Sequence, residues 1–456
     1  MRILQITAGA AGMYCGSCTR DNALARELLR RGHDVTLVPV YTPTRPDEPN
    51  VSRDRVLFGG ISVYLQQHVP LFRATPRLLD RLWDSPRVIR AFARRAISTD
   101  ARLLGDLTIS MLQGERGVLR KEFDKLADWI RAEPPPDVID LPNSLLIALA
   151  APLKHVFGRP VCCTMQGEEL FLDSLLPQYR ERALALLRRQ VPTVDRFVAV
   201  SDYCARFMSR YLEIPPSQIS VVPLGINLEG YRRPDPGSRI PDPGFTIGYF
   251  ARVASEKGLR VLAEAYIRLR RRTSARPMRL EAAGYLARAS QPYLDEVRRA
   301  LEAAGLGHEF VYRGEVDRDG KLAFLRSIDV LSVPATYDEP KGMFVLEAMA
   351  SGVPVVQPRR GSFIEMIERT GGGLLVDADD PDALAEGLHK VATTPALRAS
   401  LADCGFAGVR ARYTIAHSAD RLLEVYGEMA DGKEARGQGG EGVREQAHHV
   451  AGLPGQ

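Results

Sequence analysis

Short apolar runs alternate with amphipathic stretches along most of the chain, and this alternation predicts parallel strands separated by helices. The first unit contains an expected strand at 2–7, a glycine-bearing loop at 9–17, a helix at 22–31 and a second strand at 34–40. Gly32 follows the helix at the position where a C-cap glycine is common. Such β-loop-α-β units build parallel sheets that bind ligands at the carboxyl ends of their strands.

The alternation forms two series, divided by a segment at 232–243 that is dense in proline, glycine and charge. This composition is typical of an interdomain linker. Further strands are expected at 137–140, 160–164, 196–200 and 219–222 in the first series, and at 245–250, 279–283, 310–313, 330–333 and 353–356 in the second. The sequence therefore predicts two doubly wound, Rossmann-like α/β domains with a cleft between their strand ends.

The predicted domains cover residues 1–236 and 243–415. A less regular, helix-rich stretch at about 51–129 is expected to form an insertion in the first domain. A helix at 416–430 can cross back to that domain, and the glycine-rich, polar residues 431–456 predict a disordered tail.

Composition fits a globular protein, with 45% hydrophobic and 26% charged residues among 456. The net charge of +5 suits an enzyme that handles anionic small molecules, and no Lys/Arg-rich block with interleaved aromatics supports nucleic-acid binding. The six cysteines show no disulfide framework, which favours reduced thiols. We find neither a signal-peptide pattern nor an apolar run of ~20 residues, so a cytoplasmic protein is predicted.

The strongest candidate site lies between an expected strand that ends near Pro334 and a helix that begins near Met343. The intervening loop carries Glu339, and Glu347 follows about one turn inside the helix, which ends at Gly352. The first backbone N–H groups of a helix lack partners within it and can bind hydroxyls or a phosphate. Both glutamates can therefore face one ligand; alternatively, they only cap and solvate the helix.

This segment closely resembles the signature of glycosyltransferase family 4 (glycosyl transferases group 1), in which seven residues separate two glutamates. The resemblance implies a retaining glycosyltransferase of the GT-B fold. It assigns the transferred sugar to Glu339 and the ribose hydroxyls of the nucleotide to Glu347. It also implies that backbone amides around Gly342, Met343 and Phe344 bind the donor.

A second constellation, at 248–258, contains Arg252 and Lys257 on an expected strand-to-helix loop. Two cationic side chains here can neutralise a diphosphate as negative charge develops on it. The family carries an arginine and a lysine at matching positions, although its usual preceding glycine is Ala251 in this chain. The alternative is a solvated basic loop.

The loop after the first strand contains Gly12 and Gly16, and glycine lets a backbone approach a phosphate closely. The family places a glycine-rich loop here, facing the donor. Cys15 and Cys18 form a Cys-x-x-Cys in the same loop. A redox pair or half of a zinc site is conceivable, with the cysteines at 162–163 as partners, but packing of a crowded loop is the favoured interpretation.

After the fourth expected strand, many family members have a histidine near the reacting sugar, and this chain has Gln166. A glutamine can hydrogen-bond a hydroxyl but cannot act as a general base. Either Glu168 or Glu169 could contact the acceptor or begin a helix; we take Gln166 and Glu168 as the acceptor-side candidates. No two histidines have metal-ligand spacing, so neither a metal nor a cofactor besides the sugar-nucleotide donor is expected.

An arginine-rich segment at 73–102 also carries leucines, Trp83 and Phe92. A basic amphipathic helix of this kind can lie on an anionic membrane, or it can pack its apolar face on the domain.

The resemblance implies transfer of a hexose from a nucleoside diphosphate sugar to a carbohydrate or lipid-linked acceptor, in glycan, glycolipid or cell-envelope polysaccharide synthesis. A sugar-nucleotide epimerase and a non-catalytic nucleotide-sugar binding protein remain alternatives. A phosphorylase is less favoured, because no convincing cofactor-lysine motif is evident.

Overall fold

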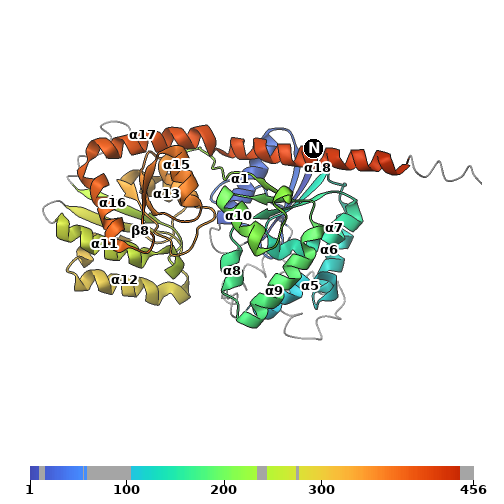
Figure 1. Cartoon of the computed structure of the whole chain (residues 1–456), viewed down its shortest axis with the longest axis horizontal. Coiled ribbons are helices and arrows are strands. Elements are labelled where there is room, and N and C mark those ends of the chain that lie inside the picture. Colours follow the sequence, from blue (N-terminus) through green and yellow to red (C-terminus); the bar gives the residue numbers. More distant parts are fainter. Residues whose placement is uncertain (10–15, 55, 59–103, 234–243, 274–276, 442–456) are drawn as a thin grey trace, which may run out of the picture.

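The computed structural model describes residues 1–9, 16–54, 56–58, 104–233, 244–273 and 277–441 (Figure 1). Two α/β domains lie side by side, and a long C-terminal helix runs along the first of them (Figure 1). Each domain contains one parallel six-stranded sheet. The alternating pattern predicts two parallel α/β domains, with six strands expected in the first and five in the second.

The first sheet has the strand order β2-β1-β3-β4-β5-β6. Its strands are β1 (Arg2–Thr7), β2 (Asp34–Pro39), β3 (Val138–Leu141), β4 (Val161–Met165), β5 (Arg196–Ala199) and β6 (Ile219–Val221). Every residue of β3 and β4 is buried, because helices cover both faces of a parallel sheet. The chain moves outward from β1 to β2 and returns to β3 on the other side of β1, so the direction of winding switches between β1 and β3.

The second sheet has the order β12-β11-β10-β7-β8-β9. Its strands are β7 (Phe245–Phe250), β8 (Met278–Ala283), β9 (Phe310–Tyr312), β10 (Val330–Leu331), β11 (Val355–Pro358) and β12 (Gly373–Val376). Here the winding switches between β7 and β10. Ligands of open α/β sheets bind outside the carboxyl ends of strands at such a switch point. The loops that carry Arg252 and Glu339 follow β7 and β10, so they meet at this point.

Helices connect the strands in both domains. Those of the first domain are α1 (Gly16–Arg30), α5 (Gly105–Gln113), α6 (Arg120–Ala132), α7 (Ala150–Phe157), α8 (Glu169–Asp173), α9 (Pro177–Gln190) and α10 (Asp202–Tyr211). Those of the second are α11 (Leu259–Arg272), α12 (Gln291–Ala303), α13 (Arg318–Ser327), α14 (Met343–Ala350), α15 (Ser362–Thr370), α16 (Pro381–Thr393) and α17 (Pro395–Arg412). The helices α5 and α6 fall within the expected insertion, most of which (59–103) lies outside the described residues.

The C-terminal helix α18 (Ile415–Glu441) crosses from the second domain to the first. Leu422 and Val425 pack with Leu24 and Leu28 of α1, and the Tyr426 hydroxyl donates a 2.9 Å hydrogen bond to Asp140. The helix continues through 431–441, which differs from the disordered tail that the glycine content predicts. Packing of the earlier turns forms the helical nucleus, and extending an existing helix costs much less than starting one.

Candidate functional site

The loop between β10 and α14 carries Glu339, the first glutamate of the sequence motif. Gly342 precedes α14 with φ of +63°, a left-handed conformation that glycine adopts at little cost. A Cβ added to Gly342 would lie 3.1 Å from the ring of Phe363. The backbone therefore makes a tight turn here, and this turn directs Glu339 toward the start of the helix.

Glu339 is 2% exposed, and both of its carboxylate oxygens have partners. Oε2 accepts a 2.5 Å hydrogen bond from the Tyr337 hydroxyl and forms an ion pair with Lys257. Oε1 accepts long hydrogen bonds from the amides of Lys341 and Gly342, at 3.3 and 3.4 Å. Burial opposes ionisation, but the Lys257 ammonium and the Tyr337 hydroxyl outweigh it and lower the pKa of Glu339 to about 2. Glu339 is therefore a fixed anion at neutral pH.

Lys257 and Arg252 both follow β7, but they differ in their surroundings. The Lys257 ammonium donates to Tyr337 Oη at 2.6 Å and lies 4.9 Å from the centre of the same ring. Arg252 instead pairs with Glu256 at 2.5 Å, and 43% of its side chain is exposed. A solvent-exposed pair between loop residues contributes little stability, so Arg252 can exchange Glu256 for an anionic ligand at small cost.

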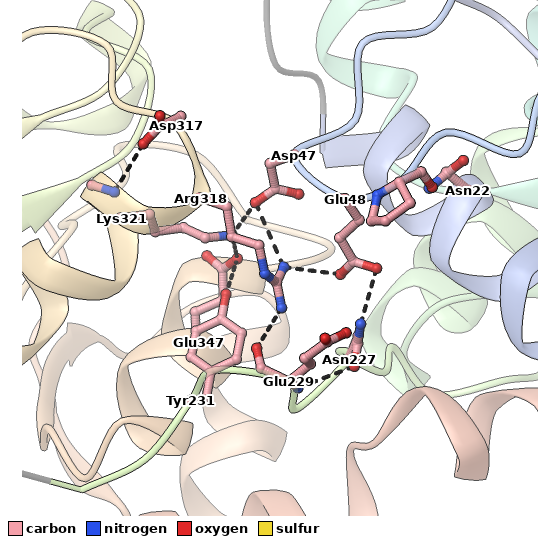
Figure 2. A network of polar contacts seen from close by, with 12 residues as sticks. Asn22, Asp47, Glu48, Asn227, Glu229, Tyr231, Asp317, Arg318, Lys321 and Glu347 are labelled. Carbon is pink, nitrogen blue, oxygen red and sulfur yellow. Dashed lines mark hydrogen bonds and ion pairs between the residues drawn. The ribbon is translucent and has the colours of Figure 1, made fainter.

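Glu347 lies within α14, and its partners lead to the other domain (Figure 2). Its Oε1 accepts hydrogen bonds from the Tyr231 hydroxyl at 3.0 Å and from Lys321 Nζ at 2.6 Å. Lys321 also forms an ion pair with Asp47, which belongs to the first domain. Burial disfavours the ammonium of Lys321, but Glu347 and Asp47 outweigh this effect and raise its pKa well above the ordinary value.

A second ion pair, between Arg318 and Glu48, also connects the two domains (Figure 2). Arg318, one turn before Lys321 on α13, pairs with Glu48 at 3.1 Å and donates to the carbonyl of Glu229 at 2.6 Å. Asn227 donates to the other oxygen of Glu48 at 3.1 Å. Sequence reasoning missed this network, which joins α13 to the loop after β2, and the only local signal is the pair of basic residues three positions apart on α13.

Gly16 and Ser17, at the start of α1, lie beside the start of α14. Gly16 is the first residue of α1, and a Cβ there would lie 3.6 Å from Met343 Sδ. The Lys341 ammonium donates a 2.8 Å hydrogen bond to the Ser17 hydroxyl. The two candidate donor-binding segments therefore meet across the domain boundary. Gly12 lies outside the described residues.

The ring of Phe344 packs against Phe363, with 5.8 Å between the ring centres, and is 9% exposed. Its side chain is thus part of the core. Because the ring is buried, Phe344 can contact a donor only through its backbone amide, as the resemblance implies.

On the acceptor side, Glu168 joins the ends of two strands. Its Oε1 accepts from the amide of Ser144 at 2.9 Å, and its Oε2 accepts from the amide of Gln166 at 2.8 Å. The Gln166 side chain donates to the carbonyl of Pro142 at 2.8 Å. In this structure Glu168 holds the backbone, whereas the neighbouring Glu169, which we did not choose as the acceptor-side candidate, is buried with both oxygens unpartnered.

Cys162 and Cys163 are free thiols that lie buried within β4. Burial raises the pKa of both thiols well above the ordinary value, which disfavours the thiolate that metal binding requires. Within the described ranges, no group of three or more His, Cys, Asp or Glu side chains could hold a metal ion. Cys15 lies outside those ranges, as does the arginine-rich segment at 73–102.

No helix among the described residues is long and apolar enough to cross a membrane.

Two family profiles match complementary parts of the chain. The profile of Glycosyltransferase Family 4 matches residues 109–229, and that of Glycosyl transferases group 1 matches residues 234–405. The chain belongs to glycosyltransferase family 4. The second match includes both glutamates of the β10–α14 segment, Arg252 and Lys257.

Curated relatives include the D-inositol 3-phosphate glycosyltransferase of Saccharomonospora viridis, 30% identical over 266 residues, which are 55% of this chain and 59% of that protein. The phosphatidyl-myo-inositol mannosyltransferase of Mycobacterium leprae is 29% identical over 234 residues, 51% of this chain and 59% of that protein. The chain thus spans a little under three fifths of the length of these relatives.

Similar solved structures include the sucrose-phosphate synthase of Thermosynechococcus elongatus, with a TM-score of 0.70 and 18% identity. The match covers 95% of this chain and all of that one. The Anabaena protein HepE, solved in complex with UDP and glucose, has a TM-score of 0.65 and 16% identity, and the match covers 94% and 100%. These likenesses confirm the predicted GT-B fold.

Proposed function

We propose that this protein transfers a hexose from a nucleoside diphosphate sugar to an acceptor hydroxyl with retention of anomeric configuration. The observation that carries the proposal is the buried, ionised Glu339, held by Lys257 at the start of α14. A fixed carboxylate accepts hydrogen bonds from sugar hydroxyls, and the helix start beside it offers backbone amides. Family membership supports the same activity.

In the proposed donor complex, Glu339 orients the sugar and Glu347 accepts hydrogen bonds from the ribose hydroxyls. Arg252 and Lys257 neutralise the diphosphate, with Gly12, Gly16 and the amides of 342–344 close to the donor. Solved structures with this fold contain UDP or UDP-glucose, which makes UDP sugars the first donors to test.

The proposed reaction forms a bond between the acceptor oxygen and the anomeric carbon as the bond from that carbon to the diphosphate breaks. The leaving diphosphate takes the hydroxyl proton on the same face of the sugar. Cationic side chains stabilise the charge that develops on the leaving group, and this supports a metal-independent reaction. Turnover unchanged by EDTA would agree with this, whereas turnover restored only by a divalent cation would contradict it.

The acceptor is proposed to be a carbohydrate or lipid-linked molecule of glycan or cell-envelope polysaccharide synthesis. The name of a curated relative that includes phosphatidyl-myo-inositol supports a lipid-linked acceptor. With such an acceptor, the protein is proposed to act at the inner face of the membrane. The basic segment at 73–102 is the candidate for peripheral contact in an otherwise cytoplasmic protein.

Thermal-shift screening with UDP, GDP and ADP sugars tests the proposal, because a ligand that binds the folded state raises its stability. A ligand at a hundred times its Kd should stabilise the protein by about 2.7 kcal/mol. The best donor is then incubated with a panel of acceptors. No shift with any nucleotide sugar contradicts the proposal; donor conversion without an acceptor indicates an epimerase instead.

A further inference from the structure

Two neighbouring strands of the first sheet end in polar side chains whose buried oxygen atoms have no hydrogen-bond partner. Asn143 Oδ1 and Ser144 Oγ follow β3. Gln166 Oε1 and both carboxylate oxygens of Glu169 follow β4. A buried polar group without a partner costs about 1–3 kcal/mol. Four such side chains lie in adjacent loops, and their unpartnered oxygens point to a site that binds a polar ligand.

Hydrogen bonds connect the backbones of these two loops. The Glu168 carboxylate accepts hydrogen bonds from the amides of Ser144 and Gln166, and the Gln166 side chain donates one to the carbonyl of Pro142. Each of these bonds is 2.8–2.9 Å long. The backbone on both sides of the unpartnered oxygens is therefore held before any ligand binds, which lowers the entropic cost of binding.

The cluster lies beside the sugar end of the proposed donor site. It follows β3 and β4, next to the switch point between β1 and β3. A Cβ added to Gly167 would lie 2.7 Å from Pro340, the residue after Glu339. Lys341 and Glu339 both act electrostatically on the carboxyl of Glu169: the first lowers its pKa and the second raises it. An acceptor held here would place a hydroxyl next to the transferred sugar.

The chemistry of the cluster selects the ligand. The amide oxygens of Asn143 and Gln166 accept hydrogen bonds, whereas the Ser144 hydroxyl both donates and accepts. A ligand with several hydroxyl groups, which also donate and accept, satisfies both kinds of atom. A phosphate brings only further oxygens and negative charge. Lys341, the cation whose charge reaches Glu169, already donates to Ser17 at 2.8 Å.

We propose that Asn143, Ser144, Gln166 and Glu169 form the subsite for an uncharged polyhydroxyl group of the acceptor, a sugar or polyol, and discriminate against a phosphorylated one. This inference rests on the proposed transferase function. Glu169 positions an acceptor hydroxyl, and the proton of that hydroxyl still passes to the leaving diphosphate.

The test is binding of matched sugars and sugar phosphates to the full chain in the presence of the nucleoside diphosphate that stabilises it most. Neutral mono- and disaccharides should bind at least tenfold more tightly than the same sugars carrying a phosphate. Asn143→Ala should weaken neutral-sugar binding about tenfold, the size of one lost hydrogen bond to a buried group. Burial raises the pKa of Glu169 to about 8, so Glu169→Gln should reduce the preference against phosphate above pH 8, where the original carboxyl is ionised.

Glu122→Gln is the matched control, since Glu122 is a buried glutamate of the same domain that pairs with Lys125 on α6. It should leave the sugar Kd within twofold, and all three variants should keep the nucleotide Kd within twofold. Tighter binding of sugar phosphates, equal loss in the control, or no sugar binding while the nucleotide binds would overturn the subsite. Failure of every nucleotide to bind would instead overturn the proposed function, and the subsite with it.

Discussion

The two glutamates of the β10–α14 segment are both buried, but they depend on different parts of the molecule. The partners of Glu339 are Lys257, Tyr337 and two amides, all from the second domain. Those of Glu347 lead through Lys321 to Asp47 of the first domain. The sugar end of the proposed donor site is thus organised by one domain alone, whereas the ribose end also depends on contact between the domains.

This difference has a consequence for ligand binding. A donor ribose that reaches Glu347 must share it with Lys321, or displace Lys321 toward Asp47. Nucleotide affinity is therefore expected to change when the domain contact is altered. The apparent affinity of a ligand depends on the fraction of molecules in the conformation that binds it. The Glu339 end should be insensitive to the same change.

Lys257→Met is expected to cause the largest loss of stability. It leaves the Glu339 carboxylate buried without its cation, which costs about 3–5 kcal/mol in comparable cases. Urea unfolding measures this loss. The double variant Lys257→Met with Glu339→Gln should recover most of it, because no uncompensated charge remains. A loss below about 1 kcal/mol in the single variant would show that the pair does not organise the sugar end.

Glu169 extends the comparison to a buried glutamate without partners. Burial, then the neighbouring Glu168, raises the pKa of Glu169 from its ordinary 4.5 to about 8. The folded state therefore prefers the protonated form, and the stability from this preference is lost as the pH rises from 4.5 through 8. Glu169→Gln should become more stable than the original protein over this window, by on the order of 2–4 kcal/mol at its upper end.

Glu339→Gln should show the opposite dependence in the same unfolding experiments. The pKa of Glu339 is lowered to about 2, so its contribution is complete above 4.5 and is lost as the pH falls through 2. The stability deficit of this variant should shrink below pH 4.5. Parallel pH curves for both variants would contradict the contrast between a paired and an unpaired carboxyl.

Asp47→Asn should affect the ribose end selectively. It removes one of the two anionic partners of Lys321, for an expected loss of about 1–2 kcal/mol. The nucleotide Kd, measured by calorimetry, should rise several-fold, because the joined arrangement of the domains is less populated. Asp34→Asn, which breaks an exposed pair with Arg2, is the control and should leave the nucleotide Kd unchanged. The same nucleotide Kd in both variants would show that nucleotide binding at Glu347 does not depend on the domain contact.

Arg252→Gln should have the smallest effect on stability, below about 0.5 kcal/mol, because it breaks only the exposed pair with Glu256. Its effect on catalysis should be large by contrast: a fall of about a hundredfold in kcat/KM for the donor, since a group that stabilises the leaving diphosphate is lost. Full activity in this variant would remove Arg252 from the proposed site.

Much of the fold was predictable from the sequence, because strand periodicity is local. The expected strands at 2–7 and 245–250 match β1 and β7 residue for residue. Beyond shifts of strand ends and the longer C-terminal helix, two further elements differ. We did not assign Gly373–Val376 as a strand, since its first residue is a poor strand former, and α1 begins at Gly16 instead of Asn22. Tertiary packing overrides weak local preferences in both places, with Cys18 and Arg20 of the early turn buried.

The site was predictable only where a motif is contiguous. The sequence motif indicates Glu339 and Glu347, but it cannot show that Lys257, 82 positions away, pairs with Glu339. Lys321 and Asp47 lie 274 positions apart and have no shared pattern. The sequence also cannot show that the side-chain oxygens of Asn143 and Glu169 are buried without hydrogen-bond partners, because this depends on the three-dimensional structure.

Calorimetric titration tests the division between the two glutamates most directly. A nucleoside diphosphate and its sugar conjugate are titrated into the original protein, Glu339→Ala and Glu347→Ala. Glu347→Ala should weaken both ligands at least tenfold, since charged hydrogen bonds to the ribose contribute about 1.5–3 kcal/mol each. Glu339→Ala should remove the advantage of the sugar conjugate and leave nucleotide binding within about threefold. Equal or negligible effects from the two substitutions would contradict the account.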